Sequence, residues 1–131
     1  MRKPTIMFIG LNPSTANDIS DDPTIRRVVS MAKAWGYGGV YMLNCFPFIS
    51  TKPDDLKDFG NNETNDHWLR WIADRSKDVV FAWGAFEIAK PRAVELAAMF
   101  PDAKALVINR DGSPRHPLYV PSNTKLVKYQ S

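Results

Sequence analysis

Short apolar runs alternate along the chain with segments in which apolar residues recur at helical spacing. Thr5–Ile9, Val40–Asn44, Asp78–Gly84 and Ala105–Asn109 are rich in apolar, β-branched and aromatic residues. Runs of this length and character predict strands that are buried on both faces, as in a parallel sheet.

The first predicted helix begins at Asp22, because Asp22 is a favourable N-cap and Pro23 suits the first helical position. It ends at Gly36, and its apolar positions recur at helical spacing: Ile25, Val28, Val29, Ala32 and Trp35. Further helices are predicted over residues 63–73 and 91–99. The residues predicted to face the core include Trp35, Trp68, Leu69, Ile72 and Phe81.

Strands that alternate with helices predict an α/β fold with right-handed crossovers. We expect a three-layer sandwich with a central four-stranded parallel sheet, formed as a single domain over residues 1–131, because no repeat or linker divides the chain. In such sheets the ligand crevice lies beyond the carboxyl ends of the strands.

Composition narrows the class of protein. No apolar run approaches the roughly 18 to 20 residues of a membrane-spanning helix, so no membrane partner is expected. The net charge of +3 permits a polyanionic partner, but no basic stripe typical of a duplex-DNA binder is evident. The single cysteine, Cys45, excludes a disulfide framework or a cysteine-rich zinc site, and it favours the reducing cytoplasm. No cofactor or metal is expected.

The loop after the first predicted strand is the first candidate binding segment. Its glycine allows a tight turn or a close approach to a ligand, and the proline extends the preceding asparagine, whose amide can then project into the crevice. The alternative is a turn that only caps the next segment. The segment reads Gly10, Leu11, Asn12, Pro13, Ser14 and Thr15.

The late segment Arg115-His116 is the second candidate. Prolines at 114, 117 and 121 stiffen this stretch, which presets a side chain at low entropic cost. The alternative is a loop histidine that bonds only to the backbone. The other histidine, His67, is predicted to be a surface residue on a helix.

Asn44 ends the second predicted strand and is the third candidate. An amide offers both donors and an acceptor, so it can pair with the edge of a nucleobase, or it can tie down a neighbouring loop. Phe46, Phe48 and Tyr37 are predicted near the rim, where they could stack on a planar ligand.

Charged residues flank the start of the first helix. Asp21 and Asp22 resemble a carboxylate pair, although Asp22 is explained as an N-cap; a metal-assisted hydrolase or transferase is the third-ranked reading. Arg26 and Arg27 could bind a phosphate or pair with these aspartates. A phosphate group would then contact Ser14, Thr15, Arg26 and Arg27.

A set of motifs spread along the chain resembles the bacterial and phage family of unknown function DUF1643. The motifs are Gly-Leu-Asn-Pro-Ser-Thr-Ala (10–16), Asp-Pro-Thr-Ile-Arg-Arg (22–27), Trp-Gly-Tyr-Gly-Gly (35–39), Asn-x-Phe (44–46), Asn-Asp (65–66), Ala-Trp-Gly (82–84) and Gly-Ser-Pro-Arg-His-Pro-Leu-Tyr (112–119). This resemblance implies a family but no activity.

The order strand–Gly-x-Asn-Pro, strand–Asn, strand–x-x-Gly, strand–loop–His-Pro is also similar to the uracil-DNA glycosylase superfamily. That resemblance implies a uracil-DNA-glycosylase-like fold in which Asn12 positions the attacking water. It further implies that Asn44 reads the base edge and that His116 steadies negative charge on the departing base. The chain departs from that superfamily in its final motif, His-Pro-Leu-Tyr, where glycosylases have a serine-containing loop.

Together these features predict a nucleobase N-glycosylase or related hydrolase acting on a base, nucleotide or modified base. Asn12 and His116 are the expected catalytic residues. The alternative is a non-catalytic module that senses a nucleotide in the same pocket. The partner in either case is a nucleobase-containing ligand, either a nucleotide or a nucleic acid such as single-stranded or modified DNA. The expected substrate contacts come from Gly10, Leu11, Pro13, Ser14, Asn44, Phe46 and Arg115.

Overall fold

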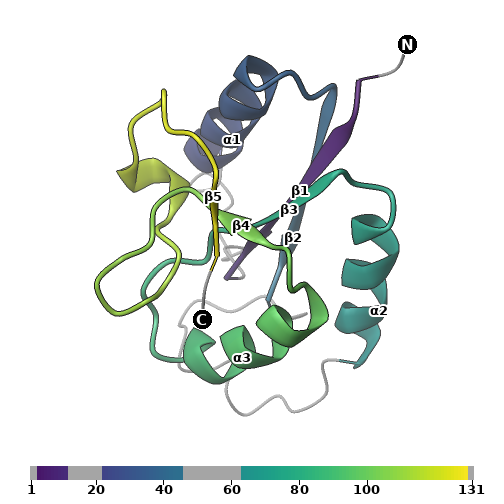
Figure 1. The fold of residues 1–131 in the computed structure, drawn as a ribbon, viewed down its shortest axis with the longest axis vertical. Coiled ribbons are helices and arrows are strands. Elements are labelled where there is room, and N and C mark those ends of the chain that lie inside the picture. Colours follow the sequence, from purple (N-terminus) through teal and green to yellow (C-terminus); the bar gives the residue numbers. More distant parts are fainter. Residues whose placement is uncertain (1–2, 12–21, 46–62, 130–131) are drawn as a thin grey trace.

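The computed structural model of the chain describes residues 3–11, 22–45 and 63–129 (Figure 1). Within these ranges it is a mixed α/β structure. The elements in chain order are β1 (Thr5–Gly10), α1 (Asp22–Ala34), β2 (Gly39–Asn44), α2 (Glu63–Ala73), β3 (Asp78–Phe81), α3 (Ala89–Met99), β4 (Lys104–Ala105), the short 3₁₀ helix η3 (Pro117–Tyr119) and β5 (Val127–Lys128). The predicted helices and the first three predicted strands are confirmed, although α3 begins two residues earlier than expected and β3 ends at Phe81 instead of Gly84.

The strands form a five-stranded sheet in the order β2-β1-β3-β4-β5. The first four strands in this order run parallel, and β5 pairs antiparallel with β4. The expectation of a four-stranded, purely parallel sheet is therefore wrong. The fifth strand comes from the C-terminal segment, for which no strand was predicted.

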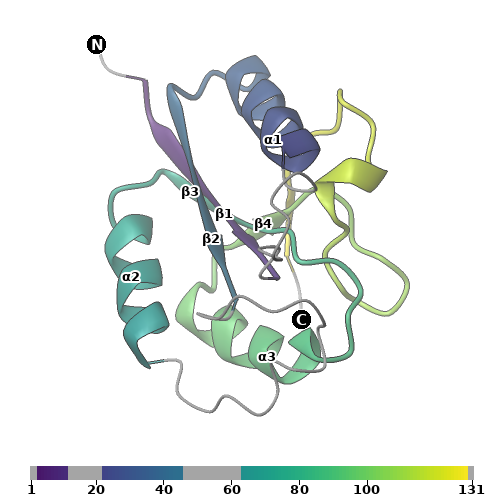
Figure 2. The ribbon, with the colours of Figure 1, turned by 180° about the vertical axis from the view of Figure 1, so that it is seen from behind.

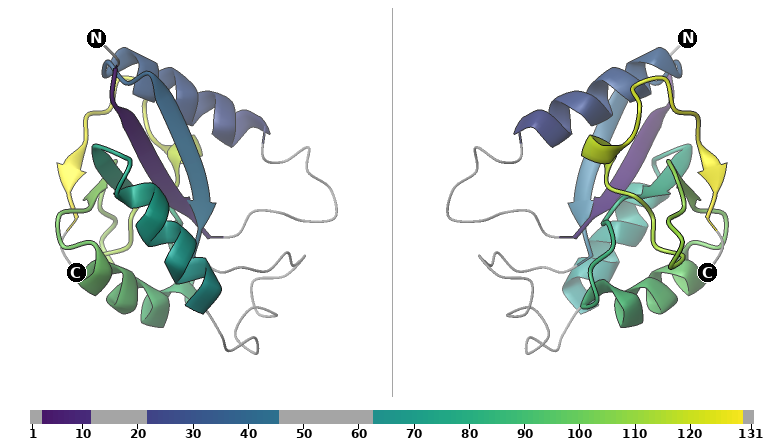
Figure 3. Two further views of the ribbon diagram at one scale, coloured as in Figure 1. Left: turned by 90° about the vertical axis from the view of Figure 1, so that its right-hand side faces the viewer. Right: turned by 90° about the vertical axis from the view of Figure 1, so that its left-hand side faces the viewer.

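Helices cover both faces of the sheet, and each face has its own core. Val28 and Met31 of α1 pack with Ile6 and Phe8 of β1 on one side, here called the α1 side. Figures 2 and 3 show α2 and α3 on the other face, where Leu69 and Leu96 pack with the alternate residues of β1. This alternation along β1 explains why its sequence is apolar at consecutive positions.

The fourth strand is shorter than predicted. β4 has only two residues, although the apolar run continues to Ile108. The backbone of 107–109 pairs instead with the returning segment: Arg115 N donates to Val107 O, and Asn109 N donates to Ser113 O. Gly112, at φ 87°, closes the turn. Local pairing with this loop replaces extension of the parallel sheet.

Trp68 of α2 was predicted to face the core, and this prediction is wrong. Trp68 is 51% exposed, whereas Leu69 is fully buried and Ile72 packs against the same core. The inward face of α2 is therefore centred one residue away from Trp68. Trp35 and Phe81 do contact the core, as expected.

In the part of the chain that the structure describes, no helix has both the length and the apolar character required to cross a membrane.

Leu69→Ala is expected to lower the free energy of unfolding by about 2–5 kcal/mol, because it removes a fully buried side chain and leaves a cavity. Urea denaturation measures the loss. Val94→Ala on α3 is the control: Val94 is 69% exposed, so its loss should change stability by less than about 0.5 kcal/mol. Equal effects would contradict the packing described for α2.

Candidate functional site

The carboxyl ends of β1 and β2 bring Gly10 and Asn44 together. These two residues are register partners in the parallel pair. A Cβ built on Gly10 would lie 3.4 Å from Asn44 Oδ1, so the side-chain amide of Asn44 lies directly beside the glycine. Val40 and Met42 of β2 pack on the α1 side, and strand alternation places the side chain of Asn44 on that side too.

The chain beyond β3 continues along the same edge and reaches Gly84. Ala82 N donates to Ile9 O, which extends the pairing with β1 past the end of β3. Gly84 has a φ of +86°, a conformation that favours glycine, and its N–H donates to Pro114 O over 2.9 Å. A Cβ at Gly84 would lie 3.7 Å from His116 Cβ and 3.5 Å from the ring of Phe86.

His116 is thus held beside Gly84 at this edge. It is the N-cap of η3, and its Nδ1 accepts a hydrogen bond from Leu118 N over 3.2 Å. The segment η3 packs against α1 (Figure 2). Val120, just beyond it, joins the α1-side core. Because Nδ1 is the acceptor, the proton of the neutral ring resides on Nε2. Burial lowers the pKa of His116, which keeps the imidazole neutral at pH 7.

Arg115 is engaged within its own loop. Its Nε donates to Asn109 Oδ1 over 2.8 Å, and Asn109 Nδ2 donates in turn to Ser113 Oγ. These bonds hold the loop between β4 and η3 in one shape. They direct at least one edge of the guanidinium toward the loop.

The other predicted site residues fall into three groups. Leu11 packs against the core on the α2 and α3 side, away from the side chain of Asn44. Arg26 and Arg27 lie near the start of α1, and neither forms an ion pair with a carboxylate that the structure describes. The predicted residues outside the described ranges are Asn12, Pro13, Ser14, Thr15, Asp21, Phe46 and Phe48.

Tyr37 was expected at the rim of the site, and this expectation is wrong. Its hydroxyl donates to Asp78 Oδ2, at the amino end of β3 and thus at the opposite edge of the sheet. Burial, together with that bond to the carboxylate, raises the pKa of Tyr37 to about 12. Asp78 also pairs with Lys104 over 3.0 Å. Tyr37 therefore joins a structural network. The expectation that His67 is a surface residue is confirmed.

Arg92 is a buried residue at this edge that was not predicted from the sequence. It is 3% exposed, and its Nε donates to Cys45 O over 2.8 Å. Its guanidinium also pairs with Asp66 of α2 and with Glu95. Burial alone would lower the pKa of Arg92, but these carboxylates raise it above its usual range. Arg92 lies four residues before Leu96 and therefore on the same, inward face of α3. A polar residue on this face is the sequence signal that could have identified it.

The end of β2 is held from both helices by this network. Asn65 Nδ2 donates to Asn44 O over 2.9 Å and to Cys45 O over 3.2 Å. Arg92 supplies the second donor to Cys45 O. The backbone that presents the Asn44 amide is thus fixed by α2 and α3. Burial raises the pKa of the Cys45 thiol, so this cysteine stays protonated and is not an activated nucleophile.

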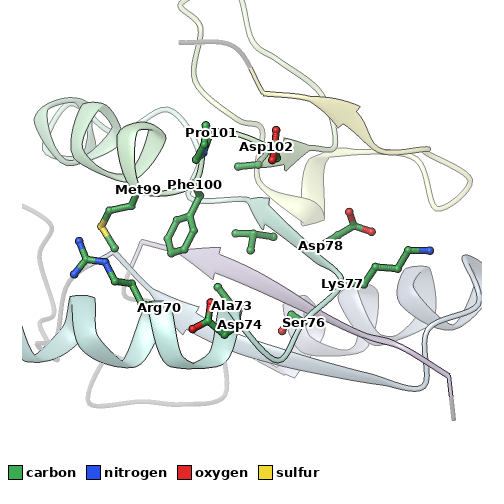
Figure 4. Close-up of a pocket in the computed structure, with 12 residues that line it drawn as sticks. Arg70, Ala73, Asp74, Ser76, Lys77, Asp78, Met99, Phe100, Pro101 and Asp102 are labelled. Carbon is green, nitrogen blue, oxygen red and sulfur yellow. The ribbon is translucent and has the colours of Figure 1, made fainter.

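A hollow of about 420 Å³ lies at the amino ends of β3 and β4, between the C-terminal ends of α2 and α3 (Figure 4). Phe100 and Ala73 lie within it, and its rim carries charges of both signs, including Arg70 and Asp102. It lies at the edge opposite Asn44 and His116, so it does not belong to their site. Within the described ranges, no group of three His, Cys, Asp or Glu residues is arranged to hold a metal ion.

Arg92→Met is expected to lower the free energy of unfolding by about 3–5 kcal/mol, because it removes the buried donor to Asp66 and one of the two donors to Cys45 O. Urea denaturation measures this loss. Lys90→Met on the same helix removes only an exposed pair with Glu87 and should change stability by about 0.5 kcal/mol or less. If the two substitutions cost the same, the network does not anchor this edge.

The lowered pKa of His116 predicts a pH dependence of stability. Between its folded pKa and the ordinary value of 6.5, the unfolded chain binds the proton and the folded chain does not. The stability from the neutral ring is therefore present above pH 6.5 and is lost as pH falls through the folded pKa. Thermal unfolding followed by circular dichroism should show a larger fall in Tm from about pH 7 to about pH 5 for wild type than for His116→Asn, which keeps an N-cap acceptor. Parallel falls would show that His116 does not titrate in this range.

Comparison with curated proteins gives no match, and comparison with solved structures gives none either. A family model does match, over residues 1–118, and its description is "Protein of unknown function (DUF1643)". The match spans β1 to η3 and includes Asn44, Arg92 and His116. The chain belongs to the DUF1643 family.

Proposed function

We propose that the edge bearing Asn44 and His116 binds a nucleobase and that the protein is a nucleobase N-glycosylase or related hydrolase. The observation that carries this proposal is the placement of both side chains at the carboxyl edge, each beside a glycine. Gly10 adjoins Asn44 and Gly84 adjoins His116. Because neither glycine has a Cβ, the side chains of Asn44 and His116 can lie close against the strand backbone at this edge.

The spacing of the strands supports a ligand of this size. Asn44 ends β2 and His116 adjoins the extension of β3, and β1 lies between these strands. Two strand spacings amount to roughly 10 Å. Asn44 Oδ1 lies beside Gly10 of β1, so the amide approaches His116 more closely than the strand backbones do, and we propose that a single planar ring bridges the two groups.

The chemistry of the two groups suits cleavage of a glycosidic bond. As the bond between sugar and base breaks, negative charge develops on the base. The Nε2 proton of His116 and the amide N–H of Asn44 are neutral donors that can stabilise this charge as it appears, and a donor of this kind typically contributes about 100- to 1,000-fold in rate. Asn12, in the role that the glycosylase resemblance gives it, would position the attacking water.

A uracil-DNA-glycosylase-like fold is the finer structural proposal. The order β2-β1-β3-β4 of the parallel strands and the helices on both faces support it. In this chain the sheet also carries the antiparallel strand β5, and β4 is only two residues long. A non-catalytic nucleotide sensor would use the same edge, because hydrogen bonds to a base edge serve binding as well as catalysis.

Asn44→Asp is expected to lower the rate of base release at least about 100-fold, because it replaces a donor by an anionic acceptor that repels the departing base. Uracil-containing and modified-base oligonucleotides and free nucleosides are the substrates, and chromatography measures the released base. His116→Asn should reduce the rate similarly. Lys33→Gln, an exposed change on the last turn of α1, is the control and should retain full activity.

Two results would decide against the enzyme. Base release at the wild-type rate by Asn44→Asp and His116→Asn would remove the proposed roles of these residues. Release from no substrate, together with a ligand-induced rise in Tm that His116→Asn abolishes, would replace the glycosylase by the sensor.

A further inference from the structure

β2 forms one edge of the sheet, and among residues 3–11, 22–45 and 63–129 no strand pairs with its outer side. Its six residues include no charge and no proline, and none of them is buried. Exposed strand edges pair readily with an added strand, so proteins usually keep them short or place charges and prolines on them. The opposite edge strand, β5, is only two residues long and carries Lys128. β2 has no such protection.

The backbone groups that point outward from β2 belong to Val40 and Met42. Cys45 N donates to Gly10 O, so the odd-numbered residues of β2 direct their backbone groups to β1 and the even-numbered residues direct theirs outward. At the carboxyl end, Asn44 O is already bonded to Asn65 Nδ2. The outer side of residues 40–43 is therefore the part that can accept a strand, and it is called the β2 edge below.

Aromatic side chains flank the β2 edge on the face of the sheet that α2 covers. Tyr41 is exposed, and strand alternation places its side chain on the same face as Leu43, which packs against the core beneath α2 and α3. Trp68 follows Asn65 by three residues, so it lies on the flank of α2 toward the end of β2 that Asn65 reaches. Trp68 is exposed as well. The two side chains make this flank of the edge apolar.

Ile25 and Val29 of α1 flank the same edge on the other face of the sheet. α1 connects β1 to β2, and Val28 faces the sheet. In a right-handed crossover whose helix runs antiparallel to the strands, the residue that follows an inward position turns toward the second strand. Val29, and Ile25 one turn before it, therefore lie on the flank of α1 toward β2, and both are exposed. In the left view of Figure 3, α1 and α2 lie on either side of β2.

We propose that the chain forms a two-fold dimer in which the β2 edge pairs antiparallel with the β2 edge of a second copy. The two sheets then become continuous. Val40 of each copy lies opposite Met42 of the other, and their outward N–H and C=O groups bond across the pair. Tyr41 lies on the two-fold axis, opposite the Tyr41 of the second copy. Equivalent helices of the two copies meet on each face of the joined sheet.

A second copy fits this edge better than a lone extended peptide. A peptide would pair with the backbone of β2 but leave Ile25, Val29 and Trp68 exposed, because these side chains lie on the helices above and below the edge. A partner that covers them needs its own strand edge with helices on both faces, and β2 with α1 and α2 is such an element. Two-fold pairing is self-complementary, and the uncharged β2 places no like charges opposite each other. The inference is independent of the reaction proposed for Asn44 and His116.

Sedimentation velocity at micromolar concentrations tests the proposal with the full chain. Wild type is expected to sediment as a dimer that dissociates on dilution. Tyr41→Lys should be monomeric over the same range, because it places two like charges opposite each other at the two-fold axis. An equimolar mixture of Tyr41→Lys and Tyr41→Glu should form dimers again, since opposite charges then face each other across the axis. Trp68→Ala should raise the Kd of the dimer about 10-fold or more, because each copy loses an aromatic contact.

Val94→Lys is the matched control, because it adds the same charge to an exposed apolar position on α3 and should leave the Kd of the dimer unchanged. Circular dichroism of each variant checks that it is folded. A wild type that stays monomeric, a Tyr41→Lys variant that dimerises as wild type does, or a lysine–glutamate mixture that stays monomeric would each overturn the proposal. Loss of the dimer in Val94→Lys would place the interface at α3 and overturn it too.

Discussion

The parallel pairing of β1 with β2 on one side and with β3 on the other is the constraint on which the candidate site depends. Ile6 to Ile9 of β1 are fully buried, and alternate residues face two different cores. A register slip of one residue would exchange these faces, so burial fixes the register strongly. That register sets Gly10 opposite Asn44 and determines the side on which the amide lies. The same hydrophobic pattern that stabilises the sheet therefore also places the polar group.

The Arg92 network converts this placement into a fixed backbone. A buried guanidinium is costly to desolvate, and its carboxylate partners only offset that cost, so such a pair is weak evidence for net stability. Its value here is geometric: donors from α2 and α3 converge on Asn44 O and Cys45 O, where β2 ends. Helices α2 and α3, on one face of the sheet, thereby fix the end of β2. The side chain of Asn44 at that end points to the other face.

Much of the fold could be predicted from the sequence because periodicity is a local signal. β1, β2, β3 and the three helices follow from apolar runs and capping residues that lie next to one another. β4 and β5 could not be predicted in this way, since whether residues 107–109 pair with β3 or with the loop depends on contacts distant in sequence. Trp68 and Tyr37 were misplaced for a similar reason: residue type suggests burial, but helix phase and a carboxylate at the far edge decide their positions. Asn44 and His116 were identified as candidates because polar residues at strand ends are conspicuous, whereas Arg92 was not, because its partners come from other elements.

Asn44 and His116, the two proposed donors at the carboxyl edge, are neutral at pH 7, and this favours differential over uniform binding. Asn44 carries no charge, burial lowers the pKa of His116, and burial raises that of Cys45, while Arg115 directs its Nε to Asn109. A free cation would attract any anion before reaction, whereas in the reaction proposed above neutral donors would gain most when charge appears on the departing base. Such donors hold a neutral base only modestly, so affinity for the substrate must arise elsewhere. In the proposed enzyme the contribution of Asn44 and His116 would therefore appear in kcat more than in KM.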